Sequence, residues 1–149
     1  MITYTDTITA EDYNRLRLSV GWQPLVPEQA AAGLRGTAFL VAAMEDGRAV
    51  GMARLVSDGG YIAFLADVIV LPEYQGRGIG RAMMERGMVY MRGQMKEGWR
   101  TLAALIAAPG KEPFYEKFGF AALHGDASGT GMSQRLERPS EGGGPCLPA

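Results

Sequence analysis

The stretch VLPEYQGRGIGRAMM, Val70 to Met84, decides the fold of this chain because it places three alternate glycines between an apolar run and a methionine-rich one. Glycine loses more backbone freedom on folding than any other residue, so Gly76, Gly78 and Gly80 need a task that a side chain would obstruct. A strand, a glycine-rich turn and a helix together form an anion site, since the first amides of the helix lack internal partners and its dipole is positive there. The pattern therefore predicts backbone amides that close on a phosphate.

The spacing of these glycines separates three phosphate-binding motifs. The dinucleotide fingerprint G-x-G-x-x-G fails, since its third glycine would fall on Arg81 or on Met83. The nucleotide P-loop fails because no Gly-Lys-Ser or Gly-Lys-Thr follows the first glycine. What remains is the pattern Gln75-x-x-Gly78-x-Gly80.

Two short helices and a meander of strands are expected before the glycines. Thr9 followed by Asp12 is typical of a helix start, and Pro27 suits a first helical turn. The run YIAFLADVIVL is apolar on both faces except for Asp67, which predicts a central strand covered on both sides. The expected elements are a strand at 2–4, a helix from Thr9 to Gly21, a helix at 28–35 stopped by Gly36, and antiparallel strands at 39–45, 49–56 and 61–70.

The residues after the glycines predict a helix, a buried strand and a short second helix. Methionines recur at spacings of four, three and four, which favours a helix with an apolar stripe. Pro113 opens the short helix, in which Phe114 and Phe118 share a face and Gly119 supplies a left-handed cap. The expected elements are a helix at 79–96 ended by Gly98, a strand at 101–108, the helix in PFYEKFGF (113–120), and strand-like runs at 120–123 and 132–136.

Length and composition set limits on domain count and partners. The 149 residues suggest one domain, expected at 1–138, while the tail 139–149 has too little apolar content to pack and is expected to be disordered. A formal charge of −1 favours neither nucleic acid nor an anionic membrane as partner. No apolar run reaches the roughly 20 residues of a membrane span. The single cysteine, Cys146, excludes a disulfide framework and a multi-thiolate metal site, so a reducing cytoplasm is the expected compartment.

Two motifs carry a family resemblance. DVIVLPEYQGRGIGRAMM (67–84) resembles the pyrophosphate-binding motif of the GNAT superfamily of acyl-CoA N-acyltransferases, and PFYEKFGF is similar to the segment in which that family presents a tyrosine beside the thioester sulfur. With the order of elements, the resemblance covers Ile2 to about Leu136. It implies an α/β fold: a mixed, mostly antiparallel sheet with a V-shaped split between its fourth and fifth strands and helices on both faces.

The resemblance also implies a coenzyme A site. The residues expected to hold the pyrophosphate are Gln75, Gly76, Arg77, Gly78, Ile79, Gly80 and Arg81. The pantetheine arm would pair with the backbone of Val68, Ile69 and Val70 as an added strand, beside Phe114 and Tyr115, and an amide of that strand would stabilise the oxyanion. A helix cap without a ligand, and a strand that is only core, are the alternatives.

Two side chains are candidates for proton transfer. The family role implied for Tyr115 is that of a general acid toward the departing thiolate; an aromatic plug is the alternative. Asp67 is the candidate base for the acceptor amine, although the family more often places Glu near this strand or uses ordered water. The equal alternative is a structural role, in which the Asp67 side chain accepts hydrogen bonds from backbone amides at a bulge.

The expected reaction is transfer of an acetyl group from acetyl-CoA to a primary amine, most simply of a small molecule, without a metal. Trp22, with Tyr13 and Tyr61, is a candidate lining of the acceptor pocket, or else a core plug. Alternatives are a protein N-terminus or lysine as acceptor, and a domain that only senses acyl-CoA or binds a partner protein. The resemblance also implies pairing as a homodimer, which no single residue of the sequence indicates.

Overall fold

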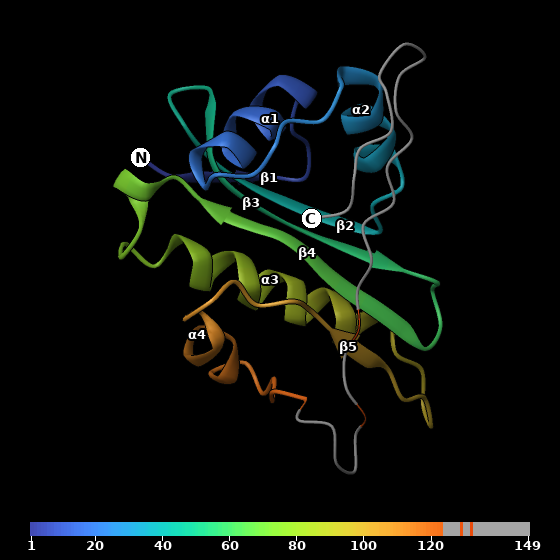
Figure 1. The fold of residues 1–149 in the computed structure, drawn as a ribbon. Helices are drawn as coiled ribbons and strands as arrows, with labels where there is room; N and C mark the ends of the chain where they lie inside the picture. Colours follow the sequence, from blue (N-terminus) through green and yellow to red (C-terminus); the bar gives the residue numbers. More distant parts are fainter. Residues whose placement is uncertain (124–128, 130–131, 133–149) are drawn as a thin grey trace, which may run out of the picture.

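Five strands and four α-helices make up the part of the chain that this computed structural model describes, residues 1–123, 129 and 132 (Figure 1). The strands lie side by side in chain order, antiparallel except for the last pair, which is parallel. The elements are β1 (Thr3–Thr5), α1 (Ala10–Ser19), α2 (Pro27–Arg35), β2 (Phe39–Glu45), β3 (Arg48–Ser57), β4 (Ile62–Val70), the 3-10 turn η1 (Pro72–Tyr74), α3 (Ile79–Gln94), β5 (Leu102–Ala104) and α4 (Glu112–Glu116).

The helices lie on both faces of the sheet, as expected. Figure 1 shows α1 and α2 on one face and α3 and α4 on the other. The N-terminal helices begin where local signals placed them: the Thr9 hydroxyl accepts a hydrogen bond from the Asp12 amide at 3.0 Å, and Pro27 opens α2. Tyr13 and Leu16 are buried against the sheet. The α/β fold class is thus confirmed.

Strand β4 carries a β-bulge opposite β3. Met52 pairs with Ile69 and Arg54 with Ala66, so two residues of β4 oppose one of β3. One of the two is Asp67, whose φ of 50° is left-handed, a conformation that Asp tolerates better than most residues. The bulge turns the Asp67 side chain toward α1.

The prediction that β4 is covered on both faces is wrong for its first half. Ile62 and Phe64 are 42% and 37% exposed, whereas their neighbours Ala63 and Leu65 are buried. The hydrogen bonds of α1 to β4 fall at Asp67, further along the strand, so these side chains alternate between core and solvent.

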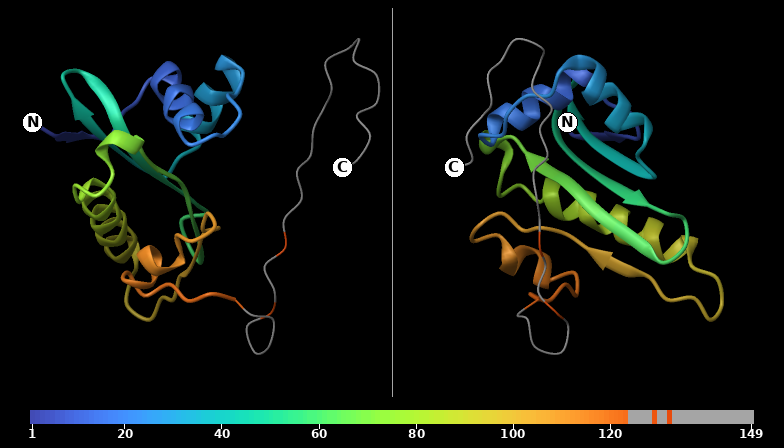
Figure 2. Two further views of the ribbon diagram at one scale, coloured as in Figure 1. Left: turned by 60° about the vertical axis from the view of Figure 1, so that its left-hand side comes forward. Right: turned by 45° about the vertical axis from the view of Figure 1, so that its right-hand side comes forward.

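The fifth strand is shorter and more exposed than expected. β5 covers only Leu102–Ala104, and Ile106 is 72% exposed, so a buried strand over 101–108 is wrong. Its parallel pairing reaches only Ile62–Phe64 of β4, and the rest of β4 continues to Val70 without it. Figure 2 shows β4 and the chain after β5 running apart, which confirms the V-shaped split.

Helix α3 ends at Gln94, two residues before the expected Lys96, because Met95 is already extended. Its buried stripe includes Met83, Met84 and Met91, whereas Met95 is 39% exposed. Helix α4 is shorter than the helix expected at 113–120, since it ends at Glu116 and Phe118 lies in the turn that follows. The Phe114 and Phe118 rings meet edge to face with centroids 5.5 Å apart, and Gly119 has the predicted left-handed conformation, with a φ of 89°.

Of the two strands predicted near the C-terminus, the first is wrong. Residues 120–123 are not a strand, and Leu123 is 56% exposed. The run expected to accompany them, 132–136, lies outside the described residues except for Met132. The boundary at residue 138 and the tail 139–149 lie outside them too.

Candidate active site

The loop between η1 and α3 depends on two left-handed glycines. Gly76 and Gly78 have φ of 74° and 79°, and Gly78 is the N-cap of α3. A β-carbon built at either would meet no atom within 4 Å, so glycine is required by the backbone conformation and not by crowding. No side chain caps the first amides of α3, which are left to a ligand or to solvent.

The third glycine has a different task. At Gly80 a β-carbon would lie 3.4 Å from Phe114 Cζ and 3.7 Å from Val70 Cγ2. Gly80 therefore allows α3 to lie close against α4 and β4. Phe114, expected at the cofactor, packs onto this glycine.

The two loop arginines differ in how their charge is compensated. Arg81 Nε donates to Glu85 Oε1 at 2.8 Å, one helical turn further on. Arg77 lies over the Tyr74 ring, with 4.8 Å from Cζ to the ring centroid, and no carboxylate among the described residues forms a salt bridge with it.

Tyr74 is itself held in place. Its hydroxyl donates to Glu45 Oε2 at 2.7 Å, and the Met1 ammonium contacts Glu45 Oε1 at 3.2 Å. The bond from Tyr74 lowers the pKa of Glu45, and the same bond raises the pKa of Tyr74. Arg77 thus rests on an anchored ring.

The open edge of β4 presents backbone groups at the end of the strand. The Leu71 amide donates to Val50 of β3 at 2.9 Å. Because successive amides of a strand point to opposite sides, the Val70 amide faces away from β3, toward the split. On that side Gln75 Nε2 donates to the Val70 carbonyl at 3.0 Å. The side chains of this strand do not distinguish a ligand-binding strand from a strand that is only core, because Ile69 is buried and Val68 and Val70 pack against the core.

Tyr115 lies on α4 among aromatic rings and packs against the core cluster that includes Leu65 and Met84. Its ring centroid is 5.1 Å from that of Phe114 and 6.4 Å from that of Phe120, both in edge-to-face geometry. Burial raises the pKa of the Tyr115 phenol, so the side chain keeps its proton at neutral pH.

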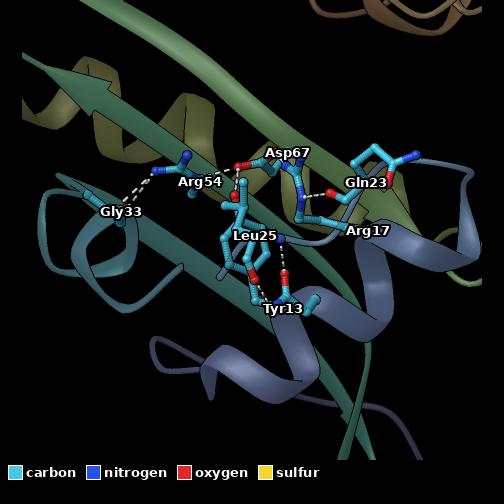
Figure 3. Close-up of polar contacts among 9 residues, drawn as sticks. Tyr13, Arg17, Gln23, Leu25, Gly33, Arg54 and Asp67 are labelled. Atoms are coloured by element: carbon cyan, nitrogen blue, oxygen red, sulfur yellow. Dashed lines mark hydrogen bonds and ion pairs between the residues drawn. The ribbon is translucent and has the colours of Figure 1, made fainter. Parts of the chain in front are cut away.

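Asp67 lies at the centre of a polar cluster between β4, β3 and α1 (Figure 3). Its Oδ2 accepts from the Tyr13 hydroxyl at 2.7 Å and pairs with Arg54 Nε, and its Oδ1 receives Arg17 Nη1 at 3.4 Å. The side chain is 9% exposed. The bulge expected at Asp67 is present, but the partners found there are side chains and not backbone amides.

The same cluster joins the N-terminal helices to the sheet. Arg54 Nη1 donates to the Gly33 carbonyl and to the Thr37 hydroxyl, each at 3.2 Å. Burial opposes the charge of Arg54, yet its hydrogen bond and charge pairing with Asp67 outweigh burial and raise the pKa of the guanidinium. Burial, and next the hydrogen bond to Asp67, raise the pKa of Tyr13.

Trp22 lies next to this cluster, on the loop between α1 and α2. Arg17 Cζ is 5.5 Å from the Trp22 ring and 5.6 Å from the Tyr13 ring. The Asn14 side chain ties the loop down through two 2.8 Å bonds to the backbone of Leu25. Tyr61 lies before the start of β4, about 20 Å along the strand from Asp67. The structure therefore brings Trp22 and Tyr13 together and leaves Tyr61 out.

Sequence reasoning missed Arg17 and Arg54. A signal for Arg54 was present, because it is a charge within an otherwise apolar strand of the meander, as Asp67 is in the next strand. Within the described ranges, no group of three or more His, Cys, Asp or Glu side chains is placed to hold a metal, and no helix is long and apolar enough to cross a membrane.

Known proteins are similar to this chain in sequence and in architecture. The model of the acetyltransferase (GNAT) domain family matches residues 35–122. An uncharacterized N-acetyltransferase of Porphyra purpurea is 28% identical over 123 residues, 80% of this chain and 68% of that protein. The chloroplastic serotonin N-acetyltransferase 2 of rice, Oryza sativa subsp. japonica, is 44% identical over 75 residues, 50% of this chain but only 36% of the rice protein.

A solved structure agrees with these matches. The crystal structure of a probable acetyltransferase of unknown function from meticillin-resistant Staphylococcus aureus superposes with a TM-score of 0.81 at 33% identity, covering 91% of this chain and all of that one. The glycine loop and the split between β4 and β5 both lie within the residues that the family model matches. The chain belongs to the GNAT acetyltransferase family.

Proposed function

We propose that this chain transfers the acetyl group of acetyl-CoA to the primary amine of a small molecule by direct attack. One observation carries the proposal: among the described residues no strand pairs with the open edge of β4 from Leu65 to Val70, and this edge leads through η1 into the left-handed glycine loop that opens α3. A ligand with an extended amide arm and a pyrophosphate end matches such an edge and loop.

In this proposal the coenzyme lies along the open edge. Its pyrophosphate takes the amides from Gln75 to Arg81, and its pantetheine arm pairs with the backbone of β4 from Val68 to Val70. Arg77 adds charge to the loop, since Arg81 is already paired with Glu85. The Val70 amide, which faces the split, is the donor for the oxyanion.

Tyr115 supplies the proton for the leaving group. The amine nitrogen forms a bond to the thioester carbon, the carbon–sulfur bond then breaks, and the departing thiolate takes the phenolic proton. A buried tyrosine with a raised pKa is protonated when this step begins.

Asp67 is better suited to positioning than to accepting a proton. Arg17 pairs with one oxygen of its carboxylate, and Arg54 and the Tyr13 hydroxyl pair with the other. Because both oxygens already have partners within the protein, we assign the proton of the attacking amine to water. Asp67 then holds Arg17 and Arg54, and through Arg17 the Trp22 side of the acceptor pocket.

The name of the rice relative, a serotonin N-acetyltransferase, supports a small amine as acceptor. Pairing as a homodimer, the exclusion of nucleic acid and membrane as partners, and a cytoplasmic location remain predictions. A domain that senses acyl-CoA without turnover remains the alternative function.

The first experiment is release of free CoA thiol from acetyl-CoA in the presence of a panel of primary amines. Wild type should release thiol with at least one amine, and Tyr115→Phe should bind acetyl-CoA equally but turn over slowly. A rise in melting temperature with acetyl-CoA and not with NAD or ATP checks the coenzyme site. Binding without turnover of any amine or peptide would favour the sensing alternative, and no binding would overturn the proposal.

A further inference from the structure

Arg17 stands out in the polar cluster because its charge is weakly compensated. Its contact to Asp67 is 3.4 Å, whereas Oδ2 of the same carboxylate takes Tyr13 at 2.7 Å and Arg54 at closer range. Its Nε donates to the Gln23 carbonyl at 3.0 Å, and among the described residues no hydrogen-bond partner is found for its Nη2.

The cluster as a whole carries an excess of positive charge. Arg17 and Arg54 face a single carboxylate, and no second carboxylate among residues 1–123 forms a salt bridge with either guanidinium. The side chains of Arg17 and Arg54 are 17% and 16% exposed, so solvent screens this charge less than at the surface.

Arg17 is also held in a fixed orientation. The Tyr13 and Trp22 rings both lie within cation–π distance of the Arg17 guanidinium. Trp22 is 37% exposed, so this group of side chains reaches solvent through Trp22 at the α1–α2 loop. A planar, pre-oriented guanidinium matches a carboxylate in shape and charge, and little side-chain entropy is lost when the two pair.

We infer that Arg17 binds a carboxylate of the acceptor, so that the small-molecule acceptor is an amine that also carries a carboxylate, as an amino acid does. This inference rests on the proposed function, because it names the substrate class of the same site.

The test uses pairs of acceptors that differ by one carboxylate. 5-Hydroxytryptophan is compared with serotonin, tryptophan with tryptamine, and tyrosine with tyramine, by thiol release from acetyl-CoA. We expect wild type to prefer the carboxylate member of a pair by at least about tenfold in kcat/KM. Arg17→Gln should abolish that preference, because it should raise KM more for the carboxylate member of each pair than for the amine that lacks a carboxylate.

Two further variants separate recognition from folding and from general charge. Arg17→Lys keeps the charge without the planar fork and should retain part of the preference. Arg35→Gln removes the same formal charge from the exposed last turn of α2 and should leave the preference unchanged. Because the readout is a ratio between two acceptors, a variant that merely loses stability lowers both members equally.

The outcomes distinguish this inference from the function on which it rests. Turnover of serotonin, tryptamine or tyramine at rates equal to or above their carboxylate partners overturns the inference and leaves the acetyltransferase proposal intact. If no amine is acetylated, N-acetylglycine is titrated against the Trp99→Phe variant, in which Trp22 is the only remaining tryptophan. A change in Trp22 fluorescence that Arg17→Gln removes supports the carboxylate site without catalysis, and no change overturns it.

Discussion

The two edges of β4 differ sharply. Toward β3 the strand is paired along its length, from Ala63 with Ser57 to Val70 with Gly51, and a cluster of charged side chains locks the bulge at Asp67. Toward β5 it is paired over only Ile62–Phe64. One strand thus combines a closed edge that holds the sheet together with an open edge that offers backbone groups to a ligand.

This difference separates two kinds of mutational effect. Changes at the closed edge should lower the free energy of unfolding, because they leave buried charges without partners. Changes at the open edge and in the glycine loop should act mainly on coenzyme binding or turnover and should lower stability less than changes at the closed edge. Four variants, taken from the largest expected effect to the smallest, test this separation.

Tyr115→Phe should lower kcat by about 1,000-fold, within the range typical of general acid catalysis, because the leaving thiolate loses its proton donor. The melting temperature and the acetyl-CoA dissociation constant should stay close to wild type, since the ring and its edge-to-face contacts remain. Burial raises the Tyr115 pKa, so wild-type kcat should decline on the alkaline side only above pH ~10, as the phenol loses its proton. An unchanged kcat in the variant would show that Tyr115 is only part of the aromatic packing.

Asp67→Asn should lower the free energy of unfolding by about 3 kcal/mol, because Arg17 and Arg54 lose their shared carboxylate in a poorly solvated cluster. Asn tolerates the left-handed backbone at this position, so the variant removes charge and little else. Urea unfolding measures the loss. The control is Glu85→Gln, which breaks an exposed ion pair with Arg81 and should cost about 0.5 kcal/mol.

The same variant tests the predicted catalytic role of Asp67. If Asp67 only positions the arginines, the pH dependence of kcat should keep its acidic limb in Asp67→Asn. Loss of that limb would instead make Asp67 the base.

Gly78→Ala should weaken acetyl-CoA binding about tenfold and cost about 1–2 kcal/mol of stability, because alanine resists a φ of 79°. Gly80→Ala is the matched control. Its backbone is ordinary, and its new β-carbon only presses on Phe114 at 3.4 Å, so its effect should be smaller on both measures. Calorimetric titration and thermal melting compare the two; equal effects would contradict the separate tasks of these glycines.

Arg77→Gln should weaken acetyl-CoA binding by about threefold, and the loss should shrink as salt is raised. Arg81→Gln should have less effect, since Glu85 already compensates the charge of Arg81. Dissociation constants measured at two salt concentrations decide between them. A larger loss in Arg81→Gln would reverse the assignment.

The sequence predicted best what local chemistry controls. The starts of α1 and α2 and the helix after the glycine loop follow from Thr9, Pro27 and Gly78. Each of these signals acts within a few residues, so it needs no knowledge of distant neighbours. The two motifs were enough for the family, because their spacing and residue types are specific.

The cluster around Asp67 shows why part of the site escaped prediction. Tyr13, Arg17, Arg54 and Asp67 come from three elements that are separated by up to 54 residues along the chain. Their meeting depends on the register of β3 against β4 and on the bulge, neither of which leaves a local trace. Arg17 was therefore unremarkable as one of several charges on an amphipathic helix.

By itself the sequence determined the α/β class, the order of most elements and the position of the glycine loop, because helix caps, turns and left-handed glycines act over short distances. Only the tertiary structure decided that β5 pairs with three residues of β4 and leaves Ile106 exposed, that Gly80 makes room for Phe114, and that Asp67 binds two arginines. Those features arise from packing between segments far apart in the chain, where apolar content alone cannot distinguish a buried strand from an exposed one.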